Sequence, residues 1–298
     1  MSKALVDKVA VVTGAGRGVG RAYALALARE GASLVINDLG SMTEGGGRDT
    51  SAADSVVKEI LDGGGNAVAN YDDVSDFAAA RQIMQTAVTH YGHLDILIAN
   101  AGIIRPKKLF EATEDDWVKV LGVHANGTFN CYRHAAPLLI ERGGGTIVTT
   151  GAGVGEGGGR VFPGLGAYRA AKAAILVLTL NAANELSPYD INVNSIMPGP
   201  TTTRMHEAFR ESLVKDHGKT QDEVKIQWPE AASPDTVPAL GVFLCTSGGR
   251  RITGRSFSVN GAKITMASSP VGTSTLQSEG AYWTVEELQR TASEWLTR

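Results

Sequence analysis

The sequence predicts an α/β fold built on a parallel β-sheet, and three observations support this prediction. Short apolar runs alternate with longer segments of helical periodicity, which is typical of βαβ units. The alternation continues from about Lys8 to Gly261 without an internal repeat or a linker. An apolar fraction of 43% in 298 residues is sufficient for one sizeable core.

Each element is predicted from its hydrophobic pattern, in chain order. Short apolar runs predict seven strands, at 9–12, 33–36, 67–69, 94–98, 146–149, 192–196 and 257–259. Helical periodicity predicts helices at about 17–29, 54–61, 77–90, 113–139 and 167–185, the fourth long enough to kink. The glycine-rich stretches 40–49 and 143–166 are predicted loops, the first of them flexible. We therefore predict one domain over residues 1–265. The extension 266–298, amphipathic at 284–296, is predicted to pack on that domain or on a neighbouring subunit.

Composition argues against several classes of protein. A formal net charge of -3 gives no reason to expect nucleic-acid binding. No apolar run has the length of a membrane span, and Met1–Lys8 lacks the pattern of a secretory signal. Cys131 and Cys245 lie in apolar stretches and are predicted to be reduced core thiols. His90 and His93 lack the spacing of metal ligands. The prediction is a cytoplasmic, metal-free protein that binds neither nucleic acid nor membrane.

A glycine-rich stretch, Thr13–Gly20, follows the first predicted strand and opens the first predicted helix. Glycines there let the backbone turn tightly, approach a pyrophosphate and pack helix against sheet. The phosphate then meets unpaired N–H groups and the positive end of the helix dipole. The motif predicts a dinucleotide site at Gly14, Arg17, Gly18, Val19 and Gly20.

Asp38, at the end of the second predicted strand, bears on the choice of dinucleotide. A carboxylate there can accept both ribose hydroxyls of the adenosine half of NAD and would repel the 2′-phosphate of NADP. The alternative is a solvated turn aspartate. Arg17 could offset the repulsion, because it brings a cation into the glycine loop. We predict NAD as the cofactor and consider NADP less favoured.

Tyr168 and Lys172 are four positions apart on a predicted helix and therefore share one face. An ammonium beside the phenol, together with the positive charge of a nicotinamide, would lower the pKa of the phenol toward neutrality. Tyr168 could then exchange a proton with a substrate hydroxyl while hydride moves at the same carbon.

Five motifs occur in an order and spacing that resemble the short-chain dehydrogenase/reductase family. They are Thr13–Gly20, Asp73-Val74, Asn100-Ala101-Gly102, Tyr168–Lys172, and Pro198-Gly199 with Thr203. The resemblance implies a doubly wound Rossmann fold with seven parallel strands. It also implies that Asp73 and Val74 hold the adenine, and that Asn100, Ala101 and Gly102 line the end of strand four. Lys172 would grip the nicotinamide ribose, with Pro198, Gly199 and Thr203 beside the ring.

A narrower resemblance points to one branch of that family. Residues 35–40, 67–74 and Val123-His124 are similar to the (3R)-hydroxyacyl-CoA dehydrogenase domains of peroxisomal multifunctional enzymes and their bacterial single-domain relatives. The tail segment 283–288 is similar to those bacterial relatives. This resemblance implies a 3-hydroxyacyl-CoA or another bulky secondary alcohol as substrate.

One departure from the family concerns a serine that usually bonds the reacting oxygen. There is no serine between Ser75 and Ser187, and alignment on the fifth strand puts Gly151 or Ala152 at this site. Thr150 or Thr149 could supply the hydroxyl, or a substrate group, water or backbone N–H could replace it. The remaining alternative is a weakened or inactive chain, with Ala152 as a natural or introduced replacement.

A second departure places His124 where the family usually has an asparagine that helps to hold a proton-relay water. A neutral imidazole both donates and accepts, so His124 could support the same relay, or it could be a structural histidine bonded to backbone. Asn126 is a weaker candidate. Met205, Phe209 and Trp228 fall in the family's variable substrate lid and are candidates to line the substrate pocket.

The function predicted from these residues is an NAD(H)-dependent oxidoreductase that interconverts a secondary alcohol and a ketone. The alternative is an NAD-binding protein with weakened or no catalysis, because the serine is missing. An epimerase or dehydratase on the same fold is a third hypothesis. A homo-oligomer, tetramer or dimer, is predicted from the family and from helix faces that carry Leu121, Phe129, Ala174 and Leu178.

Overall fold

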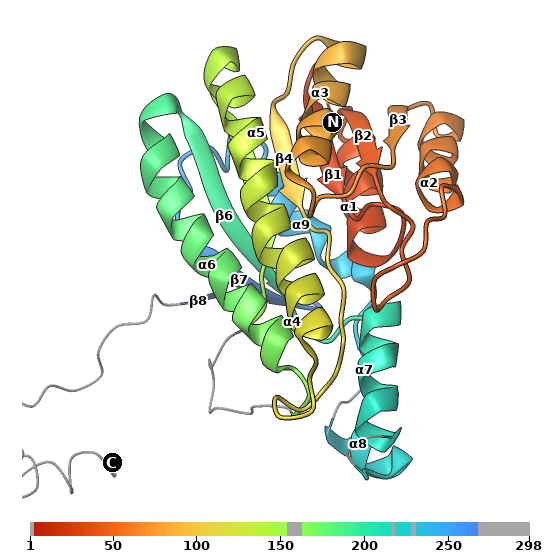
Figure 1. The fold of residues 1–298 in the computed structure, drawn as a ribbon. Coiled ribbons are helices and arrows are strands. Elements are labelled where there is room, and N and C mark those ends of the chain that lie inside the picture. Colours follow the sequence, from red (N-terminus) through yellow and green to blue (C-terminus); the bar gives the residue numbers. More distant parts are fainter. Residues whose placement is uncertain (1–2, 154–162, 216–217, 228–230, 268–298) are drawn as a thin grey trace, which may run out of the picture. The chain divides into compact units, whose positions relative to one another are not determined.

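The computed structural model describes residues 3–153, 163–215, 218–227 and 231–267 (Figure 1). The predicted C-terminal extension lies outside the described residues, so its packing stays a prediction. No described helix combines the length and the apolarity that crossing a bilayer requires. Cys131 and Cys245 are buried free thiols, as predicted.

One sheet of eight strands organises the structure. Its strands, in chain order, are β1 (Val9–Thr13), β2 (Ser33–Asn37), β3 (Asn66–Asn70), β4 (Ile96–Ala99), β5 (Gly145–Thr150), β6 (Ile191–Pro198), β7 (Ser256–Asn260) and β8 (Lys263–Ala267). The spatial order is β3-β2-β1-β4-β5-β6-β7-β8. The first seven strands are parallel, as predicted, whereas β8 pairs antiparallel with β7. This eighth strand was not predicted.

Helices cover both faces of the sheet, which confirms the doubly wound arrangement (Figure 1). The longer ones are α1 (Gly18–Arg29), α2 (Ser51–Asp62), α3 (Phe77–Tyr91), α4 (Glu114–Leu121), α5 (Gly127–Arg142), α6 (Gly166–Leu186), α7 (Arg204–Lys215), α8 (Gln221–Gln227) and α9 (Pro238–Leu244). In β1, Ala10 and Val12 face one core and Val9 and Val11 face the other. A strand buried on both faces must be apolar at every position, which explains its continuous apolar run.

The order of the sheet reverses between β1 and β4. From β1 the chain continues outward to β2 and β3, whereas β4 begins the series that runs to β7 on the other side. A crevice opens at such a reversal, outside the carboxyl ends of the strands. The glycine loop after β1 and Asn100 after β4 both lie at this crevice.

The predicted helix 113–139 is not continuous. A π-helical turn, η1 (Gly122–Asn126), separates α4 from α5 and contains His124. α4 begins with a capping box in which Thr113 and Asp116 exchange side-chain-to-backbone hydrogen bonds. π-helical turns of this kind are frequent at functional sites.

Candidate active site

One cleft of about 1010 Å³ at the carboxyl ends of the strands brings together nearly all the predicted site residues. Its lining includes the predicted cofactor residues Gly14, Arg17, Gly18, Val19, Asp38, Asp73, Val74, Asn100, Ala101, Gly102, Pro198, Gly199 and Thr203. It also includes the predicted catalytic residues Thr150, Ala152, Tyr168, Lys172 and His124. Gly20 does not line the cleft, although it shapes the glycine loop.

The glycine loop has a backbone that only glycine can follow. Gly14 and Gly18 have φ values of 62° and 55°. A Cβ on Gly14 would lie 2.8 Å from Ala101 Cα, and one on Gly20 would lie 2.0 Å from the Gly14 carbonyl oxygen. The loop therefore packs tightly on the segment after β4 while Gly18 opens α1. This is the cradle that the phosphates of a dinucleotide require.

Asp38 lies at the nucleotide end of the cleft and organises the backbone around it. Its Oδ2 accepts from the Gly16 N–H at 2.7 Å and its Oδ1 from the Gly40 N–H at 2.7 Å. Arg17 instead pairs with Asp49, at 3.0 Å. The guanidinium of Arg17 is thus engaged by a carboxylate other than Asp38.

The adenine end is closed by the segment that follows β3. Asp73 Oδ1 accepts from the N–H and the hydroxyl of Ser75, both at 2.8 Å. Asn130 Nδ2 donates to the carbonyl of Val74 at 3.0 Å. These bonds fix Asp73 and Val74 at the wall of the cleft, and their role toward the adenine stays a prediction.

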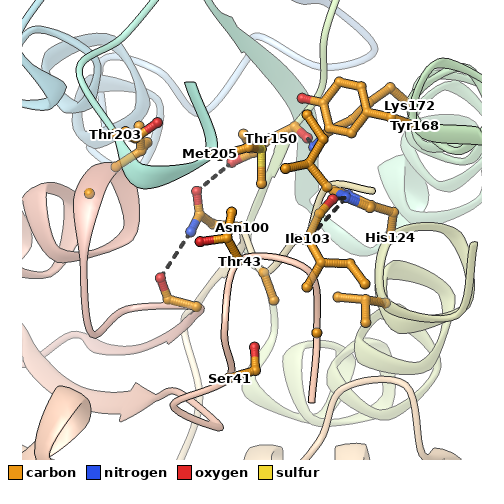
Figure 2. Close-up of a pocket in the computed structure, with 18 of the residues that line it drawn as sticks. Ser41, Thr43, Asn100, Ile103, His124, Thr150, Tyr168, Lys172, Thr203 and Met205 are labelled. Carbon is orange, nitrogen blue, oxygen red and sulfur yellow. Dashed lines mark hydrogen bonds between the residues drawn. The ribbon is translucent and has the colours of Figure 1, made fainter. Parts of the chain in front are cut away.

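Asn100 is the hydrogen-bonding centre between the two halves of the cleft (Figure 2). Its Nδ2 donates to the carbonyl oxygens of Thr13 and Gly14, at 3.1 and 3.2 Å. Its Oδ1 must therefore face Thr150, whose hydroxyl donates to it at 3.1 Å. The proton of Thr150 is committed to Asn100 rather than to the open cleft.

The structure separates the candidates for the missing serine. Thr149 is fully buried and its hydroxyl lies 3.0 Å from that of Thr179, away from the cleft. A Cβ on Gly151 would lie 2.5 Å from Ser195 Oγ, so a serine at that position would require the Ser195 side chain to move. Ala152 lines the cleft. Gly153 also lines the cleft, and a Cβ there would meet open space. The sequence did not predict Gly153 as a position for the missing serine.

Tyr168 and Lys172 lie on the first turns of α6, beside Thr150 and His124 (Figure 2). Lys172 Nζ donates to the Thr150 carbonyl at 2.5 Å and lies 5.6 Å from the centre of the Tyr168 ring. Burial lowers the pKa of Lys172 to about 7 and raises the pKa of Tyr168 to about 12. Burial outweighs the charge of Arg169, so the pKa of the phenol is raised in this structure, without the nicotinamide charge that the prediction also invoked.

His124 meets Tyr168 edge-on, with ring centres 5.3 Å apart. Its Nε2 lies 2.8 Å from the Ile103 carbonyl oxygen and 3.2 Å from the Ile103 nitrogen. The shorter contact joins a nitrogen to a carbonyl, so Nε2 carries the proton and Nδ1 the lone pair. Burial, with Lys172 nearby, lowers the pKa of His124 to about 3. The imidazole is therefore neutral.

Gly102 permits this close approach of the histidine. A Cβ on Gly102 would lie 2.4 Å from His124 Cε1. Within the described part of the chain, no hydrogen bond reaches the buried Nδ1 of His124. Asn126, the weaker candidate for the same role, also lines the cleft.

The substrate end of the cleft is apolar. Met205 and Phe209 of α7 line it, as predicted, and pack with Ile104 and Leu165. Trp228 lies outside the described residues. The cleft wall also includes Ser41, Met42 and Thr43 of the loop after β2, which sequence reasoning treated only as a flexible connection.

Comparison with known proteins decides the family. The family model described as short chain dehydrogenase matches residues 8–213. The chain belongs to this family. It is 36% identical to a short chain dehydrogenase from Mycobacterium avium of known crystal structure, with a TM-score of 0.81 over 99% of this chain and 96% of the other. A 7α-hydroxysteroid dehydrogenase solved with NADH and a 7-oxo bile acid is 27% identical, with a TM-score of 0.75 over 88% and 96%.

Two relatives represent the range of lengths in the family. The hydroxyacyl-CoA dehydrogenase ChsB1 of Mycobacterium tuberculosis is 34% identical over 96% of this chain and 88% of its own length. The peroxisomal hydratase-dehydrogenase-epimerase of Saccharomyces cerevisiae is 42% identical over 71% of this chain. The matched region spans only 23% of that yeast protein. Membership of this family, with relatives named as dehydrogenases, supports an oxidoreductase that acts on CH–OH groups.

Proposed function

We propose that this dehydrogenase uses NAD(H) to interconvert a bulky secondary alcohol, of the 3-hydroxyacyl-CoA class, and its ketone. The observation that carries the proposal is the Tyr168–Lys172 pair in the same cleft as the glycine loop and Asp38. The loop and Asp38 supply a dinucleotide site, and the pair supplies a proton carrier about where the nicotinamide end of that site must lie.

Tyr168 is the proposed acid–base group. In the oxidative direction its phenolate takes the proton of the substrate hydroxyl, and the cofactor supplies the hydride acceptor. A phenol with a pKa of about 12 is a poor base at neutral pH, so positive charge must gather beside it before it ionises. Protonated Lys172 provides one such charge, and its bond to the Thr150 carbonyl fixes where that charge lies.

His124 is the proposed link in the proton relay. The neutral ring donates from Nε2 to Ile103, so the lone pair of Nδ1 is available to accept a proton or a hydrogen bond. His124 contacts the Tyr168 ring, and the charge of Lys172 acts on it electrostatically. The ring would act by accepting a hydrogen bond at Nδ1 from a relay water beside Tyr168, while its Nε2 proton stays bonded to the Ile103 carbonyl.

Asp38 supports NAD rather than NADP. Its carboxylate stands at the end of β2 and is already bonded to two backbone N–H groups. A 2′-phosphate placed beside it would meet this negative charge, and the cation of the glycine loop, Arg17, is paired with Asp49. We expect a preference for NAD(H) in direct binding measurements.

The apolar substrate end supports a bulky substrate. An apolar cluster of Ile104, Leu165, Met205 and Phe209 lines the same cleft as Tyr168. A 3-hydroxyacyl group has an apolar chain beyond its reacting carbon, and relatives are named for such substrates. The cytoplasmic location and the homo-oligomeric state stay predictions.

Tyr168→Phe tests the mechanism. The variant keeps the ring and its packing on His124 but loses the only proton that the proposal moves directly. We expect NAD-linked oxidation of 3-hydroxyacyl-CoA substrates to fall below detection, while NADH binding stays within about 2-fold of the parent value. Tyr189→Phe, at an exposed tyrosine, is the matched control. Full turnover by Tyr168→Phe would remove the mechanism.

A second candidate function, dinucleotide binding with weak or no catalysis, is favoured by the missing serine. Thr150 lines the cleft, but its proton bonds Asn100. A donor lost from the reacting oxygen typically costs about 2.7–4 kcal/mol, or about 10²–10³ in rate. Ala152→Ser and Gly153→Ser should therefore raise kcat if the chain is a slowed enzyme. NADH binding without turnover in the parent and in both variants would favour the binding protein.

A further inference from the structure

The loop between β2 and α2, residues 40–49, forms a wall of the cleft that the motifs of the family do not account for. Ser41, Met42, Thr43, Gly45 and Gly46 line the cleft. The loop thus reaches from Asp38 at the nucleotide end to Ile103 and Ile104, which follow β4. Figure 2 shows Thr43 on the Ile103 side of the cleft and Ser41 farther from Tyr168.

Two hydroxyl groups of this loop are directed inward. Ser41, Thr43 and Gly45 are partly buried, whereas Met42 and Glu44 are exposed. The Gly45 N–H donates to the Met42 carbonyl at 3.0 Å, so Ser41 lies just before a turn and Thr43 lies inside it. Both residues line the cleft, and within the described residues neither hydroxyl makes a hydrogen bond. Their bonding capacity is therefore open to a molecule in the cleft.

The loop is fixed to the protein on both sides of the cleft. At its base the Gly40 N–H donates to Asp38 and the Asp49 N–H donates to the Leu39 carbonyl at 3.4 Å. Across the cleft, the Ile104 N–H donates to the Thr43 carbonyl at 3.0 Å. A Cβ on Gly45 would lie 3.1 Å from Ile103, so the loop tip packs directly on this segment.

Arg105 is the strongest of these anchors. Its Nε donates to the Glu44 carbonyl at 2.6 Å. Its Nη1 donates to Asp115 at 2.7 Å and to Asp116 at 3.1 Å. Asp116 is itself fixed by the capping box of α4, and the Arg105 side chain is only 16% exposed. One guanidinium thus clamps the loop tip to the start of α4.

The clamp is also connected to the catalytic side. Arg105 and Ile104 belong to the same short segment as Ile103, whose carbonyl accepts from His124. In the segment 103–105, Ile104 and Arg105 therefore bond the loop, and Ile103 bonds the relay histidine. The loop and His124 are therefore held by the same short segment.

We propose that Arg105 is a positioning residue that holds loop 40–49 closed along the bound nicotinamide dinucleotide, where the hydroxyls of Ser41 and Thr43 hydrogen-bond it. This inference rests on the proposed function, because the occupant is its cofactor. Hydroxyls on a held loop bind at a lower entropic cost than hydroxyls on a free one. Losing the clamp should therefore weaken cofactor binding more than it slows chemistry.

The test measures NADH binding by fluorescence, together with kcat and the KM for NAD. Arg105→Gln should raise the Kd of NADH about 10-fold and leave kcat within about 2-fold, because one charge-assisted anchor is lost. Arg105→Lys should recover part of the affinity, since it keeps the charge without the planar fork. Ser41→Ala and Thr43→Val should each raise the Kd about 3-fold, because each removes one hydrogen bond.

Lys108→Gln is the matched control, because Lys108 pairs with Glu111 in the same segment and does not contact the loop. Its Kd should equal that of the parent. If Arg105→Gln does not fold, the Ser41→Ala/Thr43→Val double variant carries the test alone. Unchanged NADH affinity in that double variant, or a loss of kcat without a loss of affinity in Arg105→Gln, would overturn the inference. A parent protein that binds neither NADH nor NADPH would instead overturn the proposed function.

Discussion

The two ends of the parallel sheet each bury a charged side chain, and they treat it in opposite ways. At the amino end, Asp95 precedes β4 and is 3% exposed. At the carboxyl end, Lys172 of α6 is also 3% exposed. Because the two residues have the same exposed fraction, they can be compared by the hydrogen-bond and ion-pair partners of each charge.

Asp95 is surrounded by donors. It accepts from the Val9 N–H at 2.9 Å, from Lys8 at 3.0 Å and from Arg142 at 3.1 Å. His93 lies 3.0 Å away. Burial alone would raise the pKa of the carboxyl, but these bonds more than offset it and the pKa is lowered. The ionised form is thus the one that this end of the sheet is built to hold.

Lys172 has one neutral partner. Its ammonium donates to the Thr150 carbonyl, and no carboxylate within the described residues pairs with it. Burial lowers its pKa to about 7. The Asp95 carboxylate, bonded to several donors, stabilises the fold. The buried Lys172 ammonium has no carboxylate partner in the described part of the chain and costs stability. The comparison indicates that the buried charge which lowers stability, Lys172, lies at the carboxyl end of the sheet, where the proposed chemistry takes place.

Asp95→Asn should have the larger effect on stability. The substitution keeps the size of the side chain but leaves Lys8 and Arg142 without their buried carboxylate, so we expect a loss of about 3 kcal/mol in the free energy of unfolding. Because the folded pKa is lowered, the advantage of Asp95 is present above its unfolded pKa of about 4 and is lost as the pH falls through the folded pKa. Urea unfolding at pH 7 and at low pH measures both.

Asp62→Asn, at an exposed pair with Lys58, is the control for Asp95→Asn and should change stability by less than about 0.5 kcal/mol. Equal effects at the two positions would break the comparison, because Asp95 would then behave as a surface charge.

Lys172→Met should have a smaller effect of the opposite sign. Removing an uncompensated buried cation should stabilise the fold by about 2 kcal/mol at pH 6, net of the unpaired Thr150 carbonyl, while abolishing turnover. Between about pH 7 and 10.5 the unfolded lysine holds a proton that the folded one has released, so the stability of the parent rises with pH. The advantage of the methionine variant should therefore shrink from pH 6 to pH 9 in urea unfolding. A variant less stable than the parent at both pH values would contradict this reading.

The fold could be predicted largely because its signals are local. The inner strands β1, β2, β4, β5 and β6 are buried along most of their length, so each appears as a short run with apolar residues at its centre. β8 could not be found in that way, because Lys263 to Met266 are exposed. Asn260 pairs with Lys263 across a two-residue turn that begins at Gly261, which has a φ of 57°. A two-residue turn that contains glycine is typical of a β-hairpin, so Gly261 was the signal in the sequence that could have predicted β8.

Site residues that belong to the family motifs could be predicted from the sequence. Features of the site that depend on contacts between distant segments could not. Gly14, Tyr168 and Lys172 follow from local spacing. The choice between Gly151 and Ala152 depends on Ser195 of β6, which no strand-five alignment reveals. The role of loop 40–49 depends on Arg105, which lies beyond β4 in the chain. Likewise, the pKa of Tyr168 is set by burial, which the Tyr–Lys spacing does not report.

The π-helical turn η1 also changes which surface residues share a stripe of the molecule. Each α-helical residue advances by about 100°, and the wider turn absorbs roughly one residue, so α5 is rotated back by about that angle relative to an unbroken helix. Trp117 and Phe129, 40% and 48% exposed, would lie about 120° apart without it. By this count the turn brings them to within about 20° of each other, so the two exposed aromatic residues lie along nearly the same side of the α4–α5 segment.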